Sequence, residues 1–308
     1  MNNQASVCIL MTSYNGEKFI RQQLDSIFSQ TFENWQLIIS DDGSTDKTKE
    51  IILEYQKIWG EKIQLRKGPQ KGFVENFLSL ACDKKLTADF YAFCDQDDVW
   101  LPQKLEIAIK QINNSCLNNE PYLYCGRTVY VDEKLDTIGQ STLFEQPPSF
   151  DNALVQSIAG GNTMVFNRAS KLLLETVGLV PTPSHDWWLY LLISGVGGKV
   201  FYDPNPLVLY RQHENSIVGE NNSIFNKLKR FLKLVNGRFK AWTDSNIQCL
   251  ERSENLLTQS ANESLLFFIK NRQLSFLKKI LNMKSFRYYR QSRFQNLILK
   301  IAFLMNKI

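Results

Sequence analysis

Short apolar runs alternate with segments of helical periodicity over the first third of the chain. Four such runs begin at Val7, Trp35, Ile63 and Phe90. Continuous apolar runs are typical of strands that are buried on both faces of a sheet. The segments between them repeat apolar residues every three or four positions, as helices do when one face is buried. This alternation predicts the α/β class, with a mostly parallel sheet flanked by helices.

Polar clusters follow three of these runs, at residues 12–15, 41–46 and 95–98. Because parallel strands bring their carboxyl ends to the same edge of a sheet, we expect the three clusters to converge on one site. The chain lacks both the G-x-G-x-x-G turn of dinucleotide-binding folds and the G-x-x-x-x-G-K-[ST] pattern of P-loops. A dinucleotide-binding site or a P-loop is therefore not expected.

The third cluster, Asp95-Gln96-Asp97-Asp98, is acidic. Asp95 and Asp97 are two positions apart, so in an extended segment both side chains point the same way. Two carboxylates that close repel each other unless a cation lies between them. The cluster is therefore a candidate site for Mg²⁺ or Mn²⁺ with a diphosphate, because these hard cations prefer oxygen ligands. The alternative is a solvated acidic turn that caps the next helix.

Composition narrows the class of protein. The chain has 308 residues, of which 44% are hydrophobic and 22% charged, and this favours a globular protein of one large or two modest domains. The first six residues are polar and lack the basic and apolar regions of a signal peptide. No uncharged apolar run approaches the roughly 20 residues needed to span a bilayer. The six cysteines show no C-x-x-C spacing, so we expect reduced thiols in a cytosolic protein.

The last quarter of the chain is strongly basic. Residues 225–308 contain 17 Lys and Arg against 4 Asp and Glu, and their apolar residues recur at helical spacing, as in the stripe from Phe225 to Val235. A basic amphipathic helical region favours an anionic membrane surface. Two alternatives stay open: an ordinary helical subdomain with solvated charged faces, or a surface that pairs two chains in a homodimer. No nucleic-acid-binding motif accompanies the tail, so a nucleic acid partner is not expected.

Strands and helices also alternate after residue 120, but less regularly. Tyr122–Cys125 and Thr128–Val131 are expected to be strands that pair in a hairpin. Further strands are expected at residues 163–166, 199–202 and 206–210, and helices at residues 169–177 and after His185.

The polar clusters also carry a resemblance to a known family. Thr12-Ser13-Tyr14-Asn15, Asp41-Asp42-Gly43-Ser44-Thr45-Asp46 and Asp95-Gln96-Asp97-Asp98, in this order and spacing, resemble the inverting nucleotide-sugar glycosyltransferases of the GT-A fold, family 2. His185-Asp186-Trp187-Trp188 and Tyr210-Arg211-Gln212-His213 are similar to the bacterial rhamnosyltransferase-like branch. The resemblance covers about residues 5–220, and the basic helical tail lies outside its core motifs.

The resemblance implies a division of the chain. A GT-A domain would span residues 1–220, with a nucleotide-sugar-binding half at residues 1–115 and an acceptor-binding half at residues 116–220. A basic α-helical C-terminal region would follow at residues 221–308, with a possible association with the membrane.

The resemblance also implies a nucleotide-sugar donor at the sheet edge. Tyr14 would stack on the base, and Asp42 would accept the pyrimidine N3–H, which a carboxylate does well. Contacts with the nucleotide are implied for Thr12, Ser13, Tyr14, Asn15, Asp41, Asp42, Asp95, Gln96 and Arg211. The ordinary alternatives are a core aromatic for Tyr14 and turn or helix capping for the Asp residues.

A divalent metal, Mn²⁺ or Mg²⁺, is part of the same resemblance. Asp97 would coordinate the metal. His213 stands two residues after Arg211 at the end of a predicted strand, so both side chains can face the diphosphate, and His213 would bind the metal or the pyrophosphate. A lone histidine is more often structural than a ligand, and this alternative stays open for His213.

Asp186 is the implied catalytic base. An acceptor hydroxyl must lose its proton as it attacks the anomeric carbon, and a nearby carboxylate can take that proton. Inversion by a single displacement needs only this base, because the metal stabilises the leaving nucleotide diphosphate in place of a general acid. Gly161, His185 and Trp187 would contact the acceptor. Core packing is the alternative for Trp187, and a simple turn is the alternative for Gly161.

These expectations describe a metal-dependent inverting glycosyltransferase of bacterial surface polysaccharide synthesis, either O-antigen or capsule. Rhamnose from dTDP-rhamnose is the expected sugar, and a lipid-linked saccharide is the expected acceptor. The protein would be cytoplasmic and peripheral on the inner face of the cytoplasmic membrane.

Three other functions remain alternatives. A UDP-hexose or UDP-HexNAc transferase of the same fold differs only in its donor. A nucleotidyltransferase would show a basic Gly-rich loop after the first strand, and residues 12–16 are not such a loop. A non-catalytic membrane-bound scaffold with a degenerate site is the third alternative.

Overall fold

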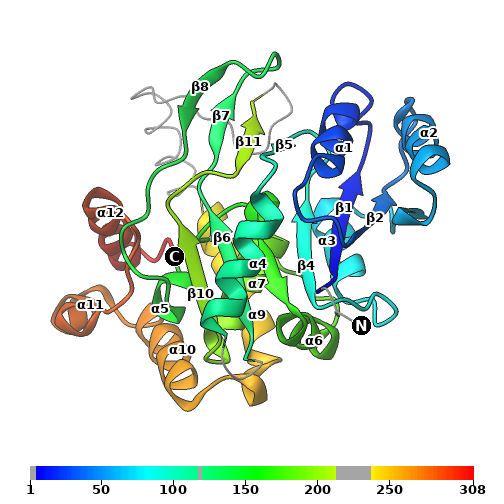
Figure 1. The fold of residues 1–308 in the computed structure, drawn as a ribbon. Coiled ribbons are helices and arrows are strands. Elements are labelled where there is room, and N and C mark those ends of the chain that lie inside the picture. The colour runs from blue at the N-terminus through cyan, green and yellow to red at the C-terminus, as the bar shows by residue number, and fades with distance from the viewer. Residues whose placement is uncertain (1–4, 117–119, 213–236) are drawn as a thin grey trace. The chain divides into compact units, whose positions relative to one another are not determined.

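The first four predicted strands pair in parallel in the computed structural model (Figure 1). β1 (Val7–Ser13) pairs with both β2 (Trp35–Asp41) and β4 (Phe90–Cys94), and β2 pairs in turn with β3 (Ile63–Lys67). Every residue of β1 and β4 is buried, which explains why these strands are continuous apolar runs. The predicted α/β class with a mostly parallel sheet is therefore confirmed.

The structure describes residues 5–116, 120–212 and 237–308. The chain divides into two units by its internal contacts. Unit 1 contains residues 1–143, 159–179 and 198–217, and unit 2 contains residues 144–158, 180–197 and 218–308. The predicted domain boundary at residues 220/221 and the apolar stripe from Phe225 to Val235 lie outside the described residues.

Helices cover both faces of the sheet in unit 1. These helices are α1 (Ile20–Phe28), α2 (Thr48–Trp59), α3 (Phe73–Ala81), α4 (Lys104–Ser115) and α6 (Arg168–Val177), and a short 3₁₀ helix, η1 (Gly60–Lys62), follows α2. Apolar residues of α1, α2 and α4 form one core with Val7, Ile9 and Met11 of β1. On the other face, Phe77 of α3 packs edge-on against Phe93 of β4, with ring centroids 5.4 Å apart.

The sheet continues beyond β4 through three more strands. Its order is β10-β6-β9-β4-β1-β2-β3, with β6 (Tyr122–Gly126), β9 (Val165–Asn167) and β10 (Lys199–Asp203). β9 runs antiparallel to both of its neighbours, and β6 pairs in parallel with β10. The hairpin expected between the strands at residues 122–125 and 128–131 is wrong, because β9 and β10 occupy both edges of β6.

The second strand of that expected hairpin belongs to a smaller sheet. This sheet has the order β5-β11-β7-β8, formed by β5 (Val99–Trp100), β11 (Val208–Arg211), β7 (Val129–Val131) and β8 (Thr137–Gln140). β5 follows the acidic cluster directly, and it pairs antiparallel with β11. The small sheet therefore attaches the strand that ends in Arg211 to the strand that follows Asp98.

Unit 2 is helical in the part that the structure describes. Its helices are α5 (Phe150–Ala153), α7 (His185–Gly195), α9 (Arg238–Glu251), α10 (Gln259–Arg272), α11 (Phe276–Leu281) and α12 (Arg293–Leu304), with 3₁₀ turns η3 (Glu254–Leu256) and η4 (Asn282–Ser285). The prediction of a helical C-terminal region is confirmed for residues 237–308. Among the described residues, no helix combines the length and apolar character required to cross a membrane.

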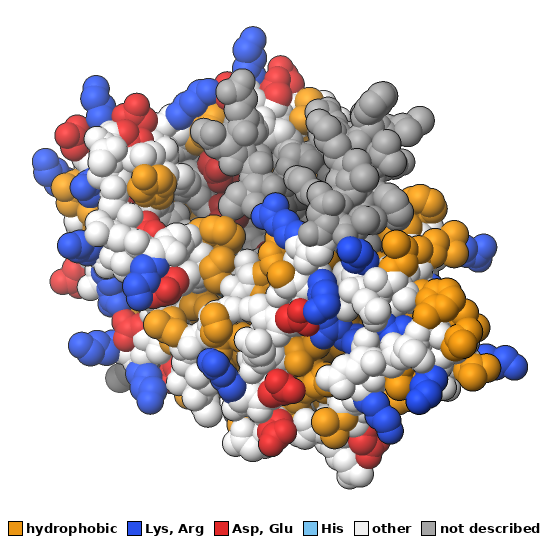
Figure 2. All heavy atoms as spheres, turned by 180° about the vertical axis from the view of Figure 1, so that it is seen from behind, with side chains coloured by type: hydrophobic (Ala, Val, Ile, Leu, Met, Phe, Trp, Pro, Cys, Tyr) orange, Lys and Arg blue, Asp and Glu red, His pale blue; other side chains and the backbone are white. Residues whose placement is uncertain are grey.

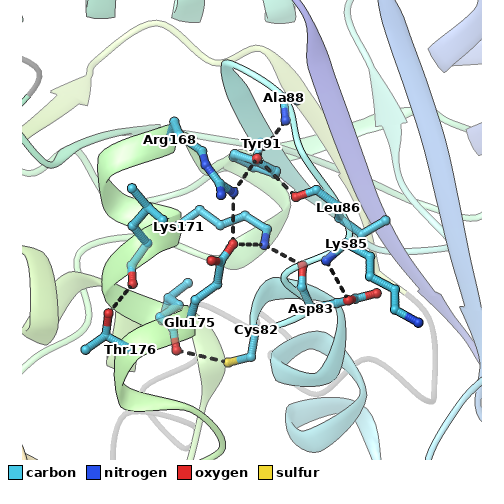
Figure 3. Close-up of polar contacts among 12 residues, drawn as sticks. Cys82, Asp83, Lys85, Leu86, Ala88, Tyr91, Arg168, Lys171, Glu175 and Thr176 are labelled. Atoms are coloured by element: carbon cyan, nitrogen blue, oxygen red, sulfur yellow. Dashed lines mark hydrogen bonds and ion pairs between the residues drawn. The ribbon is translucent and has the colours of Figure 1, made fainter.

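A buried ion pair holds α6 against the loop that precedes β4 (Figure 3). The ammonium group of Lys171 is fully buried, and it donates to the Glu175 carboxylate at 2.6 Å and to the Asp83 carbonyl at 2.8 Å. Arg168 pairs with the same carboxylate at 2.9 Å and also donates to the hydroxyl of Tyr91. Breaking a buried pair leaves an uncompensated charge in the interior, which is strongly destabilising.

We expect Lys171→Met to lower the free energy of unfolding by about 3 kcal/mol, because the Glu175 carboxylate stays buried with one cation fewer. The matched control is Lys71→Met. Lys71 pairs with Glu75 at the same spacing of four residues, at 2.8 Å, but its side chain is exposed, so no measurable change is expected. Urea unfolding followed by circular dichroism measures both variants, and equal shifts would contradict the assignment to the buried pair.

Candidate functional site

Hydrogen bonds join the three predicted polar clusters at one edge of the unit 1 sheet. The backbone N–H of Asn15 donates to the hydroxyl of Ser44 at 2.9 Å, which links the first cluster to the second. The backbone N–H of Tyr14 donates to the side chain of Gln96 at 3.0 Å, which links the first cluster to the third. The expected convergence of the clusters is therefore present in the structure.

Tyr14 presents an exposed aromatic ring beside the acidic cluster. Its side chain is 58% exposed, while its backbone is held on both sides by Gln96, since the Gln96 amide N–H also donates to the Tyr14 carbonyl at 2.9 Å. Gly16 makes room for this contact, because a Cβ atom at that position would lie 2.1 Å from the Gln96 Oε1 atom. The result is a fixed loop that offers an aromatic face for stacking.

Asp41 and Asp42 hold the second cluster in place. Asp41 is buried and accepts hydrogen bonds from the Ser13 hydroxyl at 2.9 Å and from the Ser44 backbone N–H at 2.8 Å. Asp42 accepts from the backbone N–H groups of Gln70 at 2.7 Å and Gly72 at 2.8 Å. Each carboxylate oxygen can accept more than one hydrogen bond, so Asp42 can accept a further hydrogen bond from a ligand. Its predicted contact with a base stays a prediction.

Asp98 is the buried member of the acidic cluster. Its carboxylate is fully buried and accepts from the Asn162 amide at 2.5 Å and from the Arg211 backbone N–H at 3.2 Å. Burial raises the pKa of Asp98 well above its usual value, and the neighbouring charges of Asp97 and Asp95 raise it further. Asp95 and Asp97 are half-buried by contrast. The structure therefore separates one internal carboxylate from two that lie nearer the surface.

The Arg211 guanidinium is buried and donates within the protein. It donates to the backbone carbonyl of Asp97 at 2.9 Å, to that of Glu133 at 2.6 Å and to the Gln22 side chain at 2.5 Å. It also lies over the ring of Phe19, 4.5 Å from its centroid. Arg211 thus fixes the position of the acidic loop, and its predicted contact with phosphate stays a prediction. His213 lies outside the described residues.

Two supporting residues, Gln22 and Asn162, were not among the residues predicted for the site. Asn162 directly follows the glycine pair of residues 160–161 in the short 3₁₀ helix η2 (Gly161–Thr163). The predicted acceptor residue Gly161 is buried in the same turn. The adjacent glycine pair could have drawn attention to Asn162 as a site residue. Gln22 lies in an ordinary helical stretch, and no sequence pattern there indicates a role in the site.

The oxygen ligands at the acidic loop fit a divalent cation that is coordinated partly by the protein and partly by a substrate. Asp95 and Asp97 supply hard carboxylate oxygens, whereas Asp98 is already used by Asn162 and Arg211. Within residues 5–116, 120–212 and 237–308, no three His, Cys, Asp or Glu side chains are grouped so that they could hold a metal ion. Mg²⁺ usually takes one or two carboxylates and completes its shell with water and phosphate oxygens, so two carboxylates suffice.

Asp186 stands in the first turn of α7 in unit 2. Its carboxylate accepts from the hydroxyl of Ser184, the N-cap residue, and from the backbone N–H of Trp187 at 2.5 Å. The positive end of the helix dipole favours a negative charge at this position. Asp186 is half-buried, and these two hydrogen bonds fix the orientation of its carboxylate.

The two neighbours of Asp186 are buried in unit 2. The indole N–H of Trp187 donates to the Ala153 carbonyl at 2.7 Å, and its ring stacks on Phe239 with centroids 6.0 Å apart. Burial lowers the pKa of His185 to about 4, although the charge of Asp186 acts in the opposite direction. The contacts of both residues with an acceptor stay predictions.

The sequence and the fold were compared with known proteins. The family model described as Glycosyl transferase family 2 matches residues 8–174. The dTDP-rhamnosyl transferase RfbG of Shigella flexneri is 32% identical over 237 residues, which cover 74% of this chain and 80% of that protein. The UDP-Glc:alpha-D-GlcNAc-diphosphoundecaprenol beta-1,3-glucosyltransferase WfgD of Escherichia coli is 34% identical over 187 residues, which cover 61% of this chain and 69% of that protein.

Solved structures show the same fold at low identity. Residues 1–349 of S. aureus TarS, in complex with UDP-GlcNAc, align over 75% of this chain and 67% of that chain, with a TM-score of 0.54 and 16% identity. The mannosyltransferase PcManGT of Pyrobaculum calidifontis, in complex with GDP-Man and Mn²⁺, aligns over 99% of this chain and 86% of that chain, with a TM-score of 0.53 and 15% identity. These likenesses confirm the predicted GT-A type of fold.

We expect Gly16→Ala to displace the Gln96 side chain and to lower the free energy of unfolding by about 2 kcal/mol, because two hydrogen bonds to Tyr14 are lost. Gln96→Ala should cost a similar amount, and Gly16→Ala should add little in the Gln96→Ala background, because both changes remove the same contacts. Gly139→Ala is the control, since a Cβ there meets only Tyr130 at 3.8 Å. Urea unfolding of the four variants would show full additivity if the displacement of Gln96 were wrong.

We expect His185 to have a pKa of about 4, because burial lowers it from its ordinary value of 6.5. The folded pKa lies below the unfolded value, so the neutral His185 contributes stability fully above pH 6.5 and loses it as the pH falls toward 4. The chain has only two histidines, so NMR titration of the imidazole resonances, assigned with His185→Gln, measures the value directly. A His185 pKa of 6 or above would contradict its burial.

Proposed function

The chain belongs to glycosyl transferase family 2, and on this premise we propose that it transfers rhamnose from dTDP-rhamnose to a saccharide acceptor by a metal-dependent inverting displacement. The activity of a nucleotide-sugar glycosyltransferase follows from the family and from the relatives that carry that name. The sugar, the metal, the acceptor and the residue roles are the content of the proposal.

The observation that carries the proposal is the hydrogen-bonded junction of three loops in unit 1. The exposed ring of Tyr14 and the half-buried carboxylates of Asp95 and Asp97 belong to loops that Gln96 joins directly. A nucleoside diphosphate needs an aromatic face for its base and a negative site that attracts a metal for its phosphates. The junction offers both chemistries on loops that cannot move independently.

The donor is assigned residue by residue. Tyr14 stacks on the base and Asp42 accepts the pyrimidine N3–H, while the remaining nucleotide contacts come from Thr12, Ser13, Asn15, Asp41, Asp95, Gln96 and Arg211. The choice of rhamnose is supported by the relative named as a dTDP-rhamnosyl transferase. The second candidate is a UDP-hexose or UDP-HexNAc donor, which is supported by the relative whose name contains UDP-Glc.

Asp97, with His213, is assigned to Mn²⁺ or Mg²⁺. Such a cation, when bound, neutralises the charge that develops on the leaving diphosphate. The protein's own part is to hold Asp97 in place, and Arg211 does so through the backbone carbonyl of that residue. Asn162 does the same for the next residue, Asp98.

Asp186 is assigned the role of general base. Its carboxylate accepts the proton of the acceptor hydroxyl as the new C–O bond forms on the face opposite the breaking bond to phosphate, which inverts the anomeric centre. Ser184 and the Trp187 backbone N–H orient the carboxylate for this step. Gly161, His185 and Trp187 are the residues proposed to contact the acceptor.

A lipid-linked saccharide is the proposed acceptor, in the synthesis of a bacterial surface polysaccharide such as O-antigen or capsule. Support comes from the relative whose name includes a diphosphoundecaprenol-linked sugar and from the basic C-terminal region of this chain, with 17 Lys and Arg against 4 Asp and Glu over residues 225–308. The proposed location is the cytoplasm, peripheral on the inner face of the cytoplasmic membrane.

The test is calorimetric binding of dTDP, UDP and GDP, each with and without Mn²⁺ or Mg²⁺, followed by turnover with the matching sugar nucleotide. We expect metal-dependent binding of dTDP that Asp97→Asn abolishes. Asp186→Asn should leave that binding near normal and lower turnover by roughly 10²- to 10⁴-fold, because it removes only the base. Glu50→Gln, which removes an exposed carboxylate of α2 that has no assigned role, is the control.

Each outcome bears on a different part of the proposal. Binding of UDP in place of dTDP would select the second donor. Retention of most of the turnover in Asp186→Asn would refute the assignment of the base. If no nucleotide bound under any condition, the chain would be a non-catalytic scaffold.

A further inference from the structure

The helix α11 exposes its apolar residues and buries its lysine. Leu277 and Leu281 are 73% and 79% exposed, and Phe276 and Ile280 are exposed on the same side. Lys279 is 1% exposed, and its ammonium group donates to the Phe303 carbonyl at 2.8 Å and to the Asn306 side chain. A surface helix of a globular protein shows the opposite arrangement, with apolar residues inside and charged residues outside.

Lys279 determines which way this helix faces. Its two acceptors both belong to the C-terminal part of α12 and the turn after it, and its ammonium group also lies 4.6 Å from the centroid of the Phe303 ring. Rotation of α11 about its axis to cover the leucines would break these contacts and leave an ammonium group without them. The outward direction of Leu277 and Leu281 is therefore fixed by the packing of unit 2.

The helix α12 extends the apolar surface. Its exposed apolar residues are separated by three or four positions and form one stripe, while Leu299, Ala302 and Phe303 pack inward. We call the combined surface the α11–α12 face, made up of Phe276, Leu277, Ile280, Leu281, Phe294, Leu297, Ile301 and Met305. Figure 2 shows hydrophobic side chains gathered with Lys and Arg side chains on the side where Figure 1, turned by 180°, places these helices.

The segment of the chain that carries this face has charges of a single sign. Residues 264–308 contain ten Lys and Arg and no Asp or Glu. Five of these cations are exposed on or beside the two helices: Lys278, Lys284, Arg287, Arg293 and Lys300. Of these, Arg287 pairs with the carboxylate of Asp151 at 3.3 Å. Exposed apolar patches on soluble proteins usually mark an interaction site, and the excess of positive charge beside this one favours an anionic partner.

We propose that the α11–α12 face lies in the surface of an anionic lipid bilayer, with its apolar side chains at the boundary of the acyl chains and its cations against the lipid phosphates. This inference rests on the peripheral location in the proposed function and names the surface responsible for it. A second copy of the chain would bring two positive faces together, so charge repulsion disfavours a homodimer through this face.

The test is flotation of the full-length chain with two kinds of vesicle, one of phosphatidylcholine alone and one that also contains phosphatidylglycerol. A fraction of about 30% phosphatidylglycerol gives the negative surface potential of an anionic leaflet. We expect binding to the anionic vesicles only. Leu277→Gln with Leu281→Gln should weaken it at least tenfold, because two large apolar side chains no longer leave water. The matched control, Leu53→Gln with Ile58→Gln, changes two exposed residues of α2 in unit 1 and should bind normally.

A charge variant tests the second half of the inference. Lys284→Gln with Arg293→Gln should weaken binding to anionic vesicles roughly 30-fold, since each cation near such a surface contributes about fivefold. Lys49→Gln with Lys57→Gln, again in α2, is the matched control. The inference is overturned if the wild type does not bind anionic vesicles, or if either test variant binds them as well as its control does. A lipid-free dimer that Leu277→Gln with Leu281→Gln dissociates would likewise overturn it in favour of a second copy.

Calorimetric binding of dTDP to the same samples separates this inference from the proposed function. Nucleotide binding that is normal in all variants, together with absent vesicle binding, would overturn only the membrane surface. Vesicle binding without nucleotide binding would support the α11–α12 face and count against the transferase roles of unit 1.

Discussion

Parallel pairing of β1 with β2 and β4 is the constraint on which the candidate site depends. In-register parallel strands must end at the same edge, so the loops after them meet whatever their sequences are. The hydrogen bonds from Asn15 to Ser44 and from Tyr14 to Gln96 then lock the three loops together. Because Gln96 bonds to the backbone of Tyr14, the aromatic ring and the acidic loop share one support.

Burying a carboxylate at that edge has an electrostatic cost, which hydrogen bonds from η2 and from β11 of the smaller sheet offset. Asp98 is buried among like charges, which raises its pKa, and its two donors come from Asn162 and from the backbone of Arg211. Arg211 brings a buried guanidinium to the same loop and donates to the Asp97 carbonyl. One loop thus carries two half-buried carboxylates and is held by a buried cation, which is compatible with the proposed metal and diphosphate.

Unit 2 uses two opposite helix designs. The helix α7 is buried on almost every side and holds Asp186 in its first turn, where a cap, a backbone N–H and the helix dipole all favour the carboxylate. The helix α11 leaves its leucines in water and buries Lys279. The first design suits the proposed general base, which must keep one orientation, and the second suits the proposed contact with an anionic membrane surface.

The sequence by itself determined the α/β class, the helical C-terminal region and the convergence of the three polar clusters, because apolar runs, helical periodicity and strand ends are local patterns. Only the tertiary structure decided that Asp98 is the internal carboxylate, that Arg211 donates to the backbone of the acidic loop, that β6 and β7 belong to different sheets, and that α11 exposes its leucines. Asn162 and Arg211 reach Asp98 from 64 and 113 positions away. Such partners are chosen by packing and burial, which no local pattern records.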